Sequence, residues 1–205
     1  KISRMFQILK LLKKDYPEAR CSLHYNSPFQ LLVATILSAQ CTDERVNKVT
    51  KKLFKKYPNP KDYVNLGINQ IGKEIFSTGF YNNKAKSIKG LTLMLMNDFD
   101  GIIPSNINEL VKLPGVGRKT ANVVLGNIFN VPGIVVDTHV IRIMNLLKFT
   151  KSKNAIVIER ELEEIIIRND WVLFTHLVID HGRAICIANR PNCSKCSINS
   201  LCPSS

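Results

Sequence analysis

The stretch LPGVGRKTA, Leu113–Ala121, places two glycines around one small apolar residue, after a short helix predicted over 106–112. A longer helix is predicted to follow, from Arg118 to about Phe129. Glycine permits positive φ and close backbone approach. The N–H groups that open the second helix, where the helix dipole favours an anion, could hold one phosphate without reading a base. Taken alone, the G-V-G turn equally fits a tight helical hairpin with no ligand.

Helical periodicity extends over most of the remaining chain. Apolar residues recur at three- and four-residue spacing in 2–14, and Ser27-Pro28 supplies an N-cap and a first-turn proline for a helix through Ala39. Strand alternation with hairpin signals is absent, and the extended segment Ile134–Val136 is too short to imply a sheet. The predicted fold class is therefore all-α. Further helices are predicted from Asp43 and over 60–66, 69–76, 82–97, 138–147, 154–168 and 171–187.

Composition limits the class of protein. The 205 residues are 45% hydrophobic, enough for one compact unit or two small lobes, and no apolar run reaches the length of a membrane span. The N-terminus mixes lysines with apolar residues and lacks the core of a secretory signal, so an ordinary amphipathic helix is expected there. The net charge of +13, from 29 Lys and Arg against 16 Asp and Glu, favours a polyanionic partner. No basic amphipathic anchor stands out, which favours nucleic acid over a membrane surface.

Four of the six cysteines are clustered near the C-terminus, spaced Cys186-x6-Cys193-x2-Cys196-x5-Cys202. A local cluster in a lysine-rich chain indicates a metal centre in a reducing compartment rather than a disulfide framework. A four-cysteine zinc site usually has two C-x2-C pairs, and a ferredoxin repeats its two-residue gaps. Neither pattern matches this spacing. The scattered Cys21 and Cys41 are predicted to be ordinary buried thiols.

An aspartate follows the hairpin at a distance of 18 residues from Lys119, in the segment VVDTHVIR (135–142). Asp137 ends an apolar stretch and is a plausible N-cap for the next helix. That role is compatible with chemistry, because a cap at the mouth of a helix can also face a cleft. His139 is interpreted as a structural neighbour of Asp137 without a catalytic role.

Together these segments resemble the endonuclease III family of DNA repair enzymes. The resemblance rests on the extended hairpin LPGVGRKTANVVLG (113–126), on VDTHV-x-R (136–142), and on the 6-2-5 cysteine spacing with His181-Gly182-Arg183, and it runs from about residue 4 to Cys202. It implies that Lys119 is the nucleophile and Asp137 the catalytic aspartate. It also implies a DNA contact at Gly115, Val116 and Gly117, and a 4Fe–4S cluster on Cys186, Cys193, Cys196 and Cys202.

Two further segments resemble loops that this family inserts into DNA. SAQCTD (38–43) resembles the loop whose glutamine enters the space left by the extruded nucleotide, which assigns that role to Gln40. GFYNNKA (79–85) resembles the loop that supplies an apolar wedge, commonly leucine. Phe80 stands at the wedge position; it keeps the bulk but departs from the family's pattern.

The resemblance implies a two-lobed helix-hairpin-helix glycosylase fold. A six-helix lobe over 21–131 would contain the hairpin, residues 1–20 and 132–205 would form the cluster lobe, and the substrate would lie in the cleft between them. The implied activity is excision of oxidised pyrimidines from double-stranded DNA, followed by β-elimination at the abasic site through a lysine Schiff base. A monomer that acts inside the cell, at the nucleoid, is expected.

Three other classes of protein fit the sequence less well. An adenine mismatch glycosylase would carry a glutamate before the glutamine loop, no lysine at the hairpin position and an extra C-terminal domain; 28–40 contains no acid, and Lys119 is present. A non-catalytic DNA-binding module would need neither Lys119 nor Asp137. A redox protein would leave the hairpin and the net charge unexplained.

Overall fold

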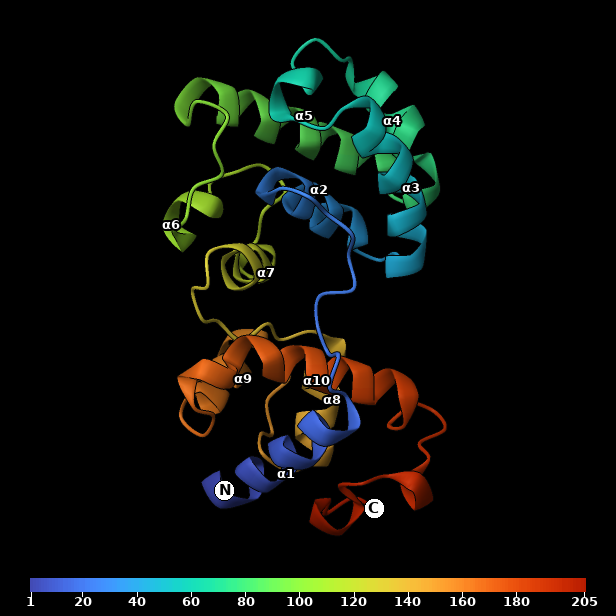
Figure 1. Cartoon of the computed structure of the whole chain (residues 1–205), viewed down its shortest axis with the longest axis vertical. Coiled ribbons are helices and arrows are strands. Elements are labelled where there is room, and N and C mark those ends of the chain that lie inside the picture. Colours follow the sequence, from blue (N-terminus) through green and yellow to red (C-terminus); the bar gives the residue numbers. More distant parts are fainter. The chain divides into compact units, whose positions relative to one another are not determined.

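The computed structural model describes all residues from Lys1 to Ser205 and contains helices without a β-strand (Figure 1), which confirms the predicted all-α class. None of the helices combines the length and the apolar character that crossing a bilayer requires. The α-helices are α1 (Ile2–Asp15), α2 (Pro28–Ser38), α3 (Asp43–Lys56), α4 (Ile68–Ile75), α5 (Tyr81–Asp98), α6 (Ile107–Leu110), α7 (Arg118–Ile128), α8 (Thr138–Leu146), α9 (Ala155–Glu163) and α10 (Trp171–Ala184). Short 3-10 helices are η1 (Pro60–Tyr63), η2 (Phe76–Thr78), η3 (Arg168–Asp170), η4 (Cys193–Lys195) and η5 (Asn199–Leu201).

The chain divides into two compact units. The central unit is Ser22–Asn130 and contains α2 to α7. The terminal unit joins Lys1–Cys21 to Val131–Ser205 and contains α1, α8, α9, α10 and the cysteine segment. The hairpin and the cysteines thus belong to different units.

The central unit is built around α2. This helix is mostly apolar, and every residue from Phe29 to Leu37 is buried, as expected of a helix enclosed by its neighbours. It begins where Ser27 Oγ accepts from the Gln30 N–H at 3.2 Å, with Pro28 in the first turn. Helices α3, α5 and α7 pack against it. The turn that follows α2 and the turn that precedes α5 are therefore both anchored to well-packed helices.

In the terminal unit the first helix packs against the C-terminal half of the chain. Met5, Ile8 and Leu12 of α1 enter the same core as residues of α8, α9 and α10. Arg4 donates to the carbonyls of Leu147 at 2.6 Å and of Leu201 at 3.1 Å, which ties α1 to the cysteine segment. Figure 1 shows α1 alongside α10, a packing that the contacts of the two helices also give.

Several predicted helices end earlier in the structure than the sequence indicates, and the one predicted over 106–112 stops at Leu110. The helix predicted over 154–168 stops at Glu163, because the N–H groups of Ile165 and Ile166 both turn back to Leu162 O and the Trp171 indole donates to Ile166 O at 2.9 Å. The helix predicted over 171–187 stops at Ala184. Beyond it the chain folds back, with Asn192 N–H donating to Ile185 O at 2.9 Å. The segment 60–66 forms only the 3-10 turn η1.

Candidate functional site

The glycine turn joins α6 to α7 within the central unit. Gly115 adopts φ +79°, and Val116 N–H donates to Leu113 O at 3.0 Å, which closes the turn. Gly117 is the N-cap of α7 and has no side chain to accept from the first helical turn. The Val116 side chain is buried, so it anchors the turn in the core. A hydrogen-bond acceptor from outside the helix would therefore contact the backbone N–H groups around Gly115 and Gly117.

Gly115→Ala is expected to destabilise the protein by about 2–4 kcal/mol, the sum of the left-handed backbone cost and of overpacking. A Cβ at this position would lie 2.6 Å from Ser87 Cβ, and φ is already positive. Gly117→Ala is the matched control, because Gly117 has a negative φ and nothing within 4 Å of a Cβ; its cost should stay below about 1 kcal/mol. Urea denaturation of both variants measures the difference in the free energy of unfolding. Equal losses of stability would show that the close approach of Gly115 to Ser87 of α5 is unimportant.

Lys119 occupies the second residue of α7 and is exposed to solvent. None of the ion pairs found in the structure involves it. Its amine is thus free to meet a ligand held at the turn. The protein by itself does not shield this amine from water.

Asp137 caps α8 in the terminal unit. Its Oδ1 accepts from the N–H groups of His139 and Val140 at 2.9 Å each, and its Oδ2 lies 3.0 Å from His139 Nδ1. The segment that leads to it is fixed by Thr175, whose hydroxyl bonds both the N–H and the carbonyl of Val135. The carboxylate, 13% exposed, is therefore held in one orientation by three contacts.

Gln40 and Phe80 lie at the tips of two turns of the central unit. Both have left-handed backbones, with φ of 52° and 47°, and both are exposed, Phe80 to 63%. A non-glycine residue costs of the order of 1–2 kcal/mol in this conformation. An exposed phenylalanine on such a turn contributes nothing to the core. Exposure therefore distinguishes Phe80 from a core aromatic, whereas Gln40 also fits the left-handed residue that commonly ends a helix.

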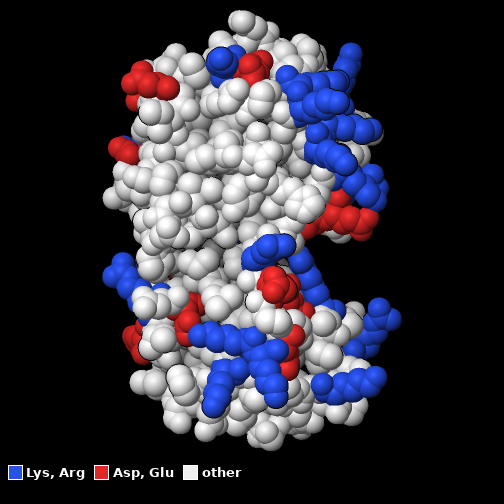
Figure 2. All heavy atoms as spheres, in the orientation of Figure 1, with Lys and Arg blue, Asp and Glu red and all other residues white.

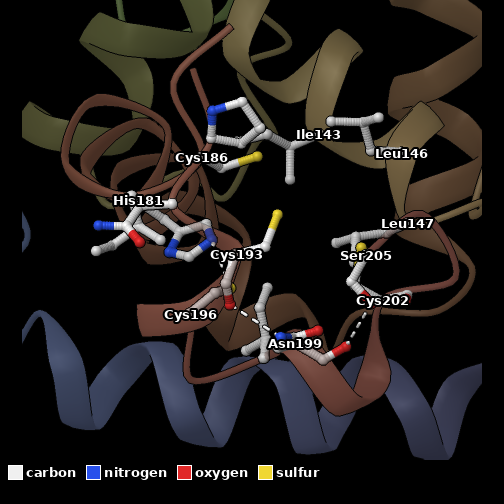
Figure 3. Close-up of a pocket in the computed structure, with 14 residues that line it drawn as sticks. Ile143, Leu146, Leu147, His181, Cys186, Cys193, Cys196, Asn199, Cys202 and Ser205 are labelled. Atoms are coloured by element: carbon white, nitrogen blue, oxygen red, sulfur yellow. Dashed lines mark hydrogen bonds between the residues drawn. The ribbon is translucent and has the colours of Figure 1, made fainter. Parts of the chain in front are cut away.

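The four clustered cysteines line a single cavity in the terminal unit (Figure 3). Apolar side chains from the end of α8, Ile143 and Leu146, and of its C-cap Leu147 form part of its wall. Arg142 Nη1 lies 3.5 Å from Cys186 Sγ. No three His, Cys, Asp or Glu side chains converge closely enough here to hold a single metal ion. Burial raises the pKa of the Cys196 thiol, and the three other cysteines raise it further while a backbone hydrogen bond opposes them.

His181 links this cavity to α1. Its Nδ1 lies 3.2 Å from the Tyr16 hydroxyl and its Nε2 3.7 Å from Cys196 Sγ. Burial lowers the pKa of His181 and raises the pKa of Tyr16 to about 12, so the ring is neutral and the phenol protonated at pH 7. In the neutral ring one nitrogen donates and the other accepts, so His181 connects the Tyr16 hydroxyl to the Cys196 sulfur through its two nitrogens. The next residue, Gly182, lets α8 and α10 approach, because a Cβ there would lie 2.7 Å from His139.

Lysine side chains are concentrated along α3. Figure 2 shows Lys and Arg atoms gathered over this helix at one edge of the central unit. Exposed lysines on it are Lys48, Lys51, Lys52, Lys55 and Lys56. Only Lys48 and Lys56 have carboxylate partners among the ion pairs found, Glu44 and Glu74. This row offers an electrostatic surface to a polyanion.

The structure thus brings the turn Gly115–Gly117 and Lys119 together, and it gathers the four cysteines. It also bonds Asp137 to His139, the structural neighbour that the sequence indicated. Sequence reasoning missed Lys84, although a signal was present: it falls on the face of α5 that is otherwise apolar, one turn before Ile88.

Comparison with known proteins gives a consistent result. The model of the family described as HhH-GPD superfamily base excision DNA repair protein matches residues 33–168. A protein of Synechocystis sp. named Endonuclease III is 51% identical over 205 residues, covering 100% of this chain and 94% of that protein. The solved structure described as "Structure of a non-covalent Endonuclease III-DNA Complex" has a TM-score of 0.96 at 42% identity and covers 100% of this chain and 96% of that chain. A trapped endonuclease III–DNA covalent intermediate has a TM-score of 0.95 at the same identity and coverage.

The helical fold, the glycine hairpin and the family match define a base excision repair protein of the HhH-GPD superfamily. Identity of this degree over the whole chain then makes the assignment specific: the chain belongs to the endonuclease III family. It is a DNA glycosylase with abasic-site lyase activity, as the resemblance implied.

Proposed function

We propose that the chain excises oxidised or ring-saturated pyrimidines from double-stranded DNA and cuts the strand at the resulting abasic site, with Lys119 as nucleophile. The observation that carries this proposal is the place of Lys119, an exposed and unpaired amine in the first turn of α7, directly after the glycine turn. A phosphate bound at the N–H groups of that turn would bring the neighbouring sugar to the amine.

The reaction proceeds in two stages. The neutral amine of Lys119 attacks C1′ of the deoxyribose, the N-glycosidic bond breaks, and the base leaves with a proton. The ring opens to a Schiff base, a proton is lost from C2′, and the C3′–O bond breaks to release the 3′ phosphate. Hydrolysis then frees the lysine. Because Lys119 is exposed, bound DNA itself must exclude water from the amine before the attack.

We assign the charge-stabilising role to Asp137. Positive charge develops on the sugar as the glycosidic bond breaks, and a fixed carboxylate lowers the energy of that state. The contacts from His139 and Val140 hold this carboxylate without reorganisation during the reaction. Gln40 and Phe80 are proposed to enter the duplex, where the glutamine fills the space of the extruded nucleotide and the phenylalanine opens the stack.

Activity on defined duplexes tests this function. The purified protein is incubated with a duplex that contains one dihydrothymine, with the undamaged duplex, and with a duplex that contains one abasic site and borohydride. We expect base release and strand cleavage on the first, none on the second, and a covalent protein–DNA adduct on the third. Base release without an adduct would contradict the lyase mechanism, and no release would contradict the substrate class.

We further propose that Cys186, Cys193, Cys196 and Cys202 hold a 4Fe–4S cluster. The donor set fits such a group, since four thiols line one cavity with apolar walls, and nitrogen atoms of Arg142 and His181 face two of the sulfurs. A cationic centre among the four sulfurs would favour their deprotonated, metal-binding form. The bound cluster would order residues 186–202, and no step of the base-excision chemistry passes through it. A cluster of this kind is retained in a reducing compartment, which supports a location inside the cell with the DNA.

Cys196→Ser is expected to lose most of the bound iron and to loosen the C-terminal segment. The wild type should contain roughly four iron atoms and four sulfides per chain, with broad absorption in the visible range. Cys21→Ser is the control, because Cys21 does not line the cavity, and it should retain the iron. Iron and sulfide analysis with limited proteolysis of the 186–202 segment measures both effects. Undiminished iron in Cys196→Ser would contradict the assignment.

A further inference from the structure

Lys84 is a buried lysine in the first turn of α5 that the reaction above does not use. Its side chain is only 6% exposed, and its Nζ donates to the carbonyls of Leu37 and Thr78 at 2.8 Å each. An ammonium near a helix N-terminus opposes the helix dipole, and burial lowers the pKa of Lys84. A cation is tolerated in such a place when strong acceptors surround it.

Both acceptors lie at the ends of helices that lead into the two exposed turns. Leu37 is in the last turn of α2, three residues before Gln40, and Thr78 ends η2, two residues before Phe80. The other carbonyls of that last turn of α2 are bonded locally: Thr35 O by Ser38 Oγ, Ile36 O by Ala39 N–H and Ser38 O by Cys41 N–H. Lys84 thus satisfies the one carbonyl that the turn itself leaves open, and it does so from another helix.

We propose that Lys84 is a positioning residue for DNA insertion, which fixes the Gln40 turn and the Phe80 turn relative to one another by bridging Leu37 O and Thr78 O. This inference rests on the proposed role of Gln40 and Phe80 in entering the duplex. The two turns are far apart in the sequence, and all of the atoms involved belong to the central unit.

The backbone of the two turns shows why a bridge is needed. Gln40 and Phe80 both hold left-handed conformations that non-glycine residues adopt only where their surroundings impose them. The Lys84 N–H also donates to Phe80 O at 3.1 Å, so one residue bonds the backbone on both sides of the Phe80 turn. Without the ammonium, each turn could relax independently, and the two insertion residues would no longer reach the duplex in register.

Lys84→Met tests the proposal, with Lys89→Met as a matched control. Lys89 lies on the same helix and also bridges two backbone carbonyls, those of Tyr63 and Val64, which belong to neither turn. Each substitution keeps the length and removes the donors, and each should lower the unfolding midpoint by about 5 °C. Lys84→Met should slow single-turnover excision from the dihydrothymine duplex by at least about 10-fold, and Lys89→Met by less than about 3-fold. Equal losses in the two variants would overturn the proposal.

A second measurement separates positioning from general loss of structure. At an abasic site there is no base to unpair, so borohydride trapping by Lys84→Met should remain within about 3-fold of the wild type. In a protein that already carries Gln40→Ala and Phe80→Ala, adding Lys84→Met should change excision by less than about 2-fold, because Lys84 acts through those residues. A further 10-fold loss in that background, or an equal loss in trapping, would overturn the proposal.

An error in the proposed function and an error in the role of Lys84 would give different results in these experiments. If the wild type neither excises dihydrothymine nor forms an adduct, the function is wrong before any variant is compared. If the wild type does both, and the Gln40→Ala, Phe80→Ala protein excises the base as fast as the wild type, the insertion roles are wrong. The proposal for Lys84, which depends on them, is then wrong as well. If the double variant loses excision activity while Lys84→Met excises the base at the wild-type rate, only the positioning role of Lys84 is wrong.

Discussion

Lys119→Gln is expected to abolish the borohydride-trapped adduct and to slow both base excision and strand cleavage by at least about 10³-fold, because it removes the nucleophilic amine of both stages. The change should leave the free energy of unfolding within about 0.5 kcal/mol, since Lys119 is exposed and glutamine suits a helix. Gel analysis of the adduct and a denaturation curve measure the two quantities on the same protein.

Lys112→Gln provides the control for this result. Lys112 is also exposed and lies just before the glycine turn, so its loss changes the local charge equally without touching the proposed nucleophile. Its adduct should form at a rate within about 3-fold of the wild type, apart from a weaker affinity at low salt. An adduct from Lys119→Gln at the wild-type rate would assign the Schiff base to another amine.

The sequence was most informative where local chemistry decides the structure. Ser27-Pro28 started α2 at the predicted residue, and the largely apolar character of 28–38 made that helix the centre of its unit. The glycine turn was likewise predictable, because Gly115 adopts the positive φ that the pattern of two glycines favours. These features depend on residues a few positions apart, where propensity and capping are strong.

Features that depend on distant residues could not be predicted in the same way. Lys84 reaches a carbonyl 47 residues away, and no local pattern marks Leu37 as its acceptor. The end of α9 depends on the indole of Trp171, beyond the predicted end of that helix. Val116 could be assigned to the turn, but its burial depends on how the hairpin packs in the central unit. Tertiary contacts decide these points, and they override helix propensity.

Asp137→Asn is expected to separate catalysis from helix capping. Asparagine is as good an N-cap as aspartate, so its Oδ1 can still accept from His139 and Val140, and the loss of stability should stay near 0.5–1 kcal/mol from the lost charge at the helix N-terminus. Base excision should nevertheless fall by about 10²–10³-fold, because the neutral amide cannot stabilise the positive charge that develops on the sugar. Single-turnover excision and urea denaturation measure the two effects.

The abasic duplex distinguishes this residue from Lys119. An abasic sugar already carries a reactive carbonyl and needs no glycosidic bond broken, so Asp137→Asn should still form the borohydride-trapped adduct within about 10-fold of the wild type. Asp137→Ala should lose excision to the same extent but cost about 1–2 kcal/mol more stability than Asp137→Asn, because the cap is removed as well. If Asp137→Asn excised bases at the wild-type rate while Asp137→Ala did not, the aspartate would be a helix cap alone, and the catalytic carboxylate would have to be sought elsewhere in the chain.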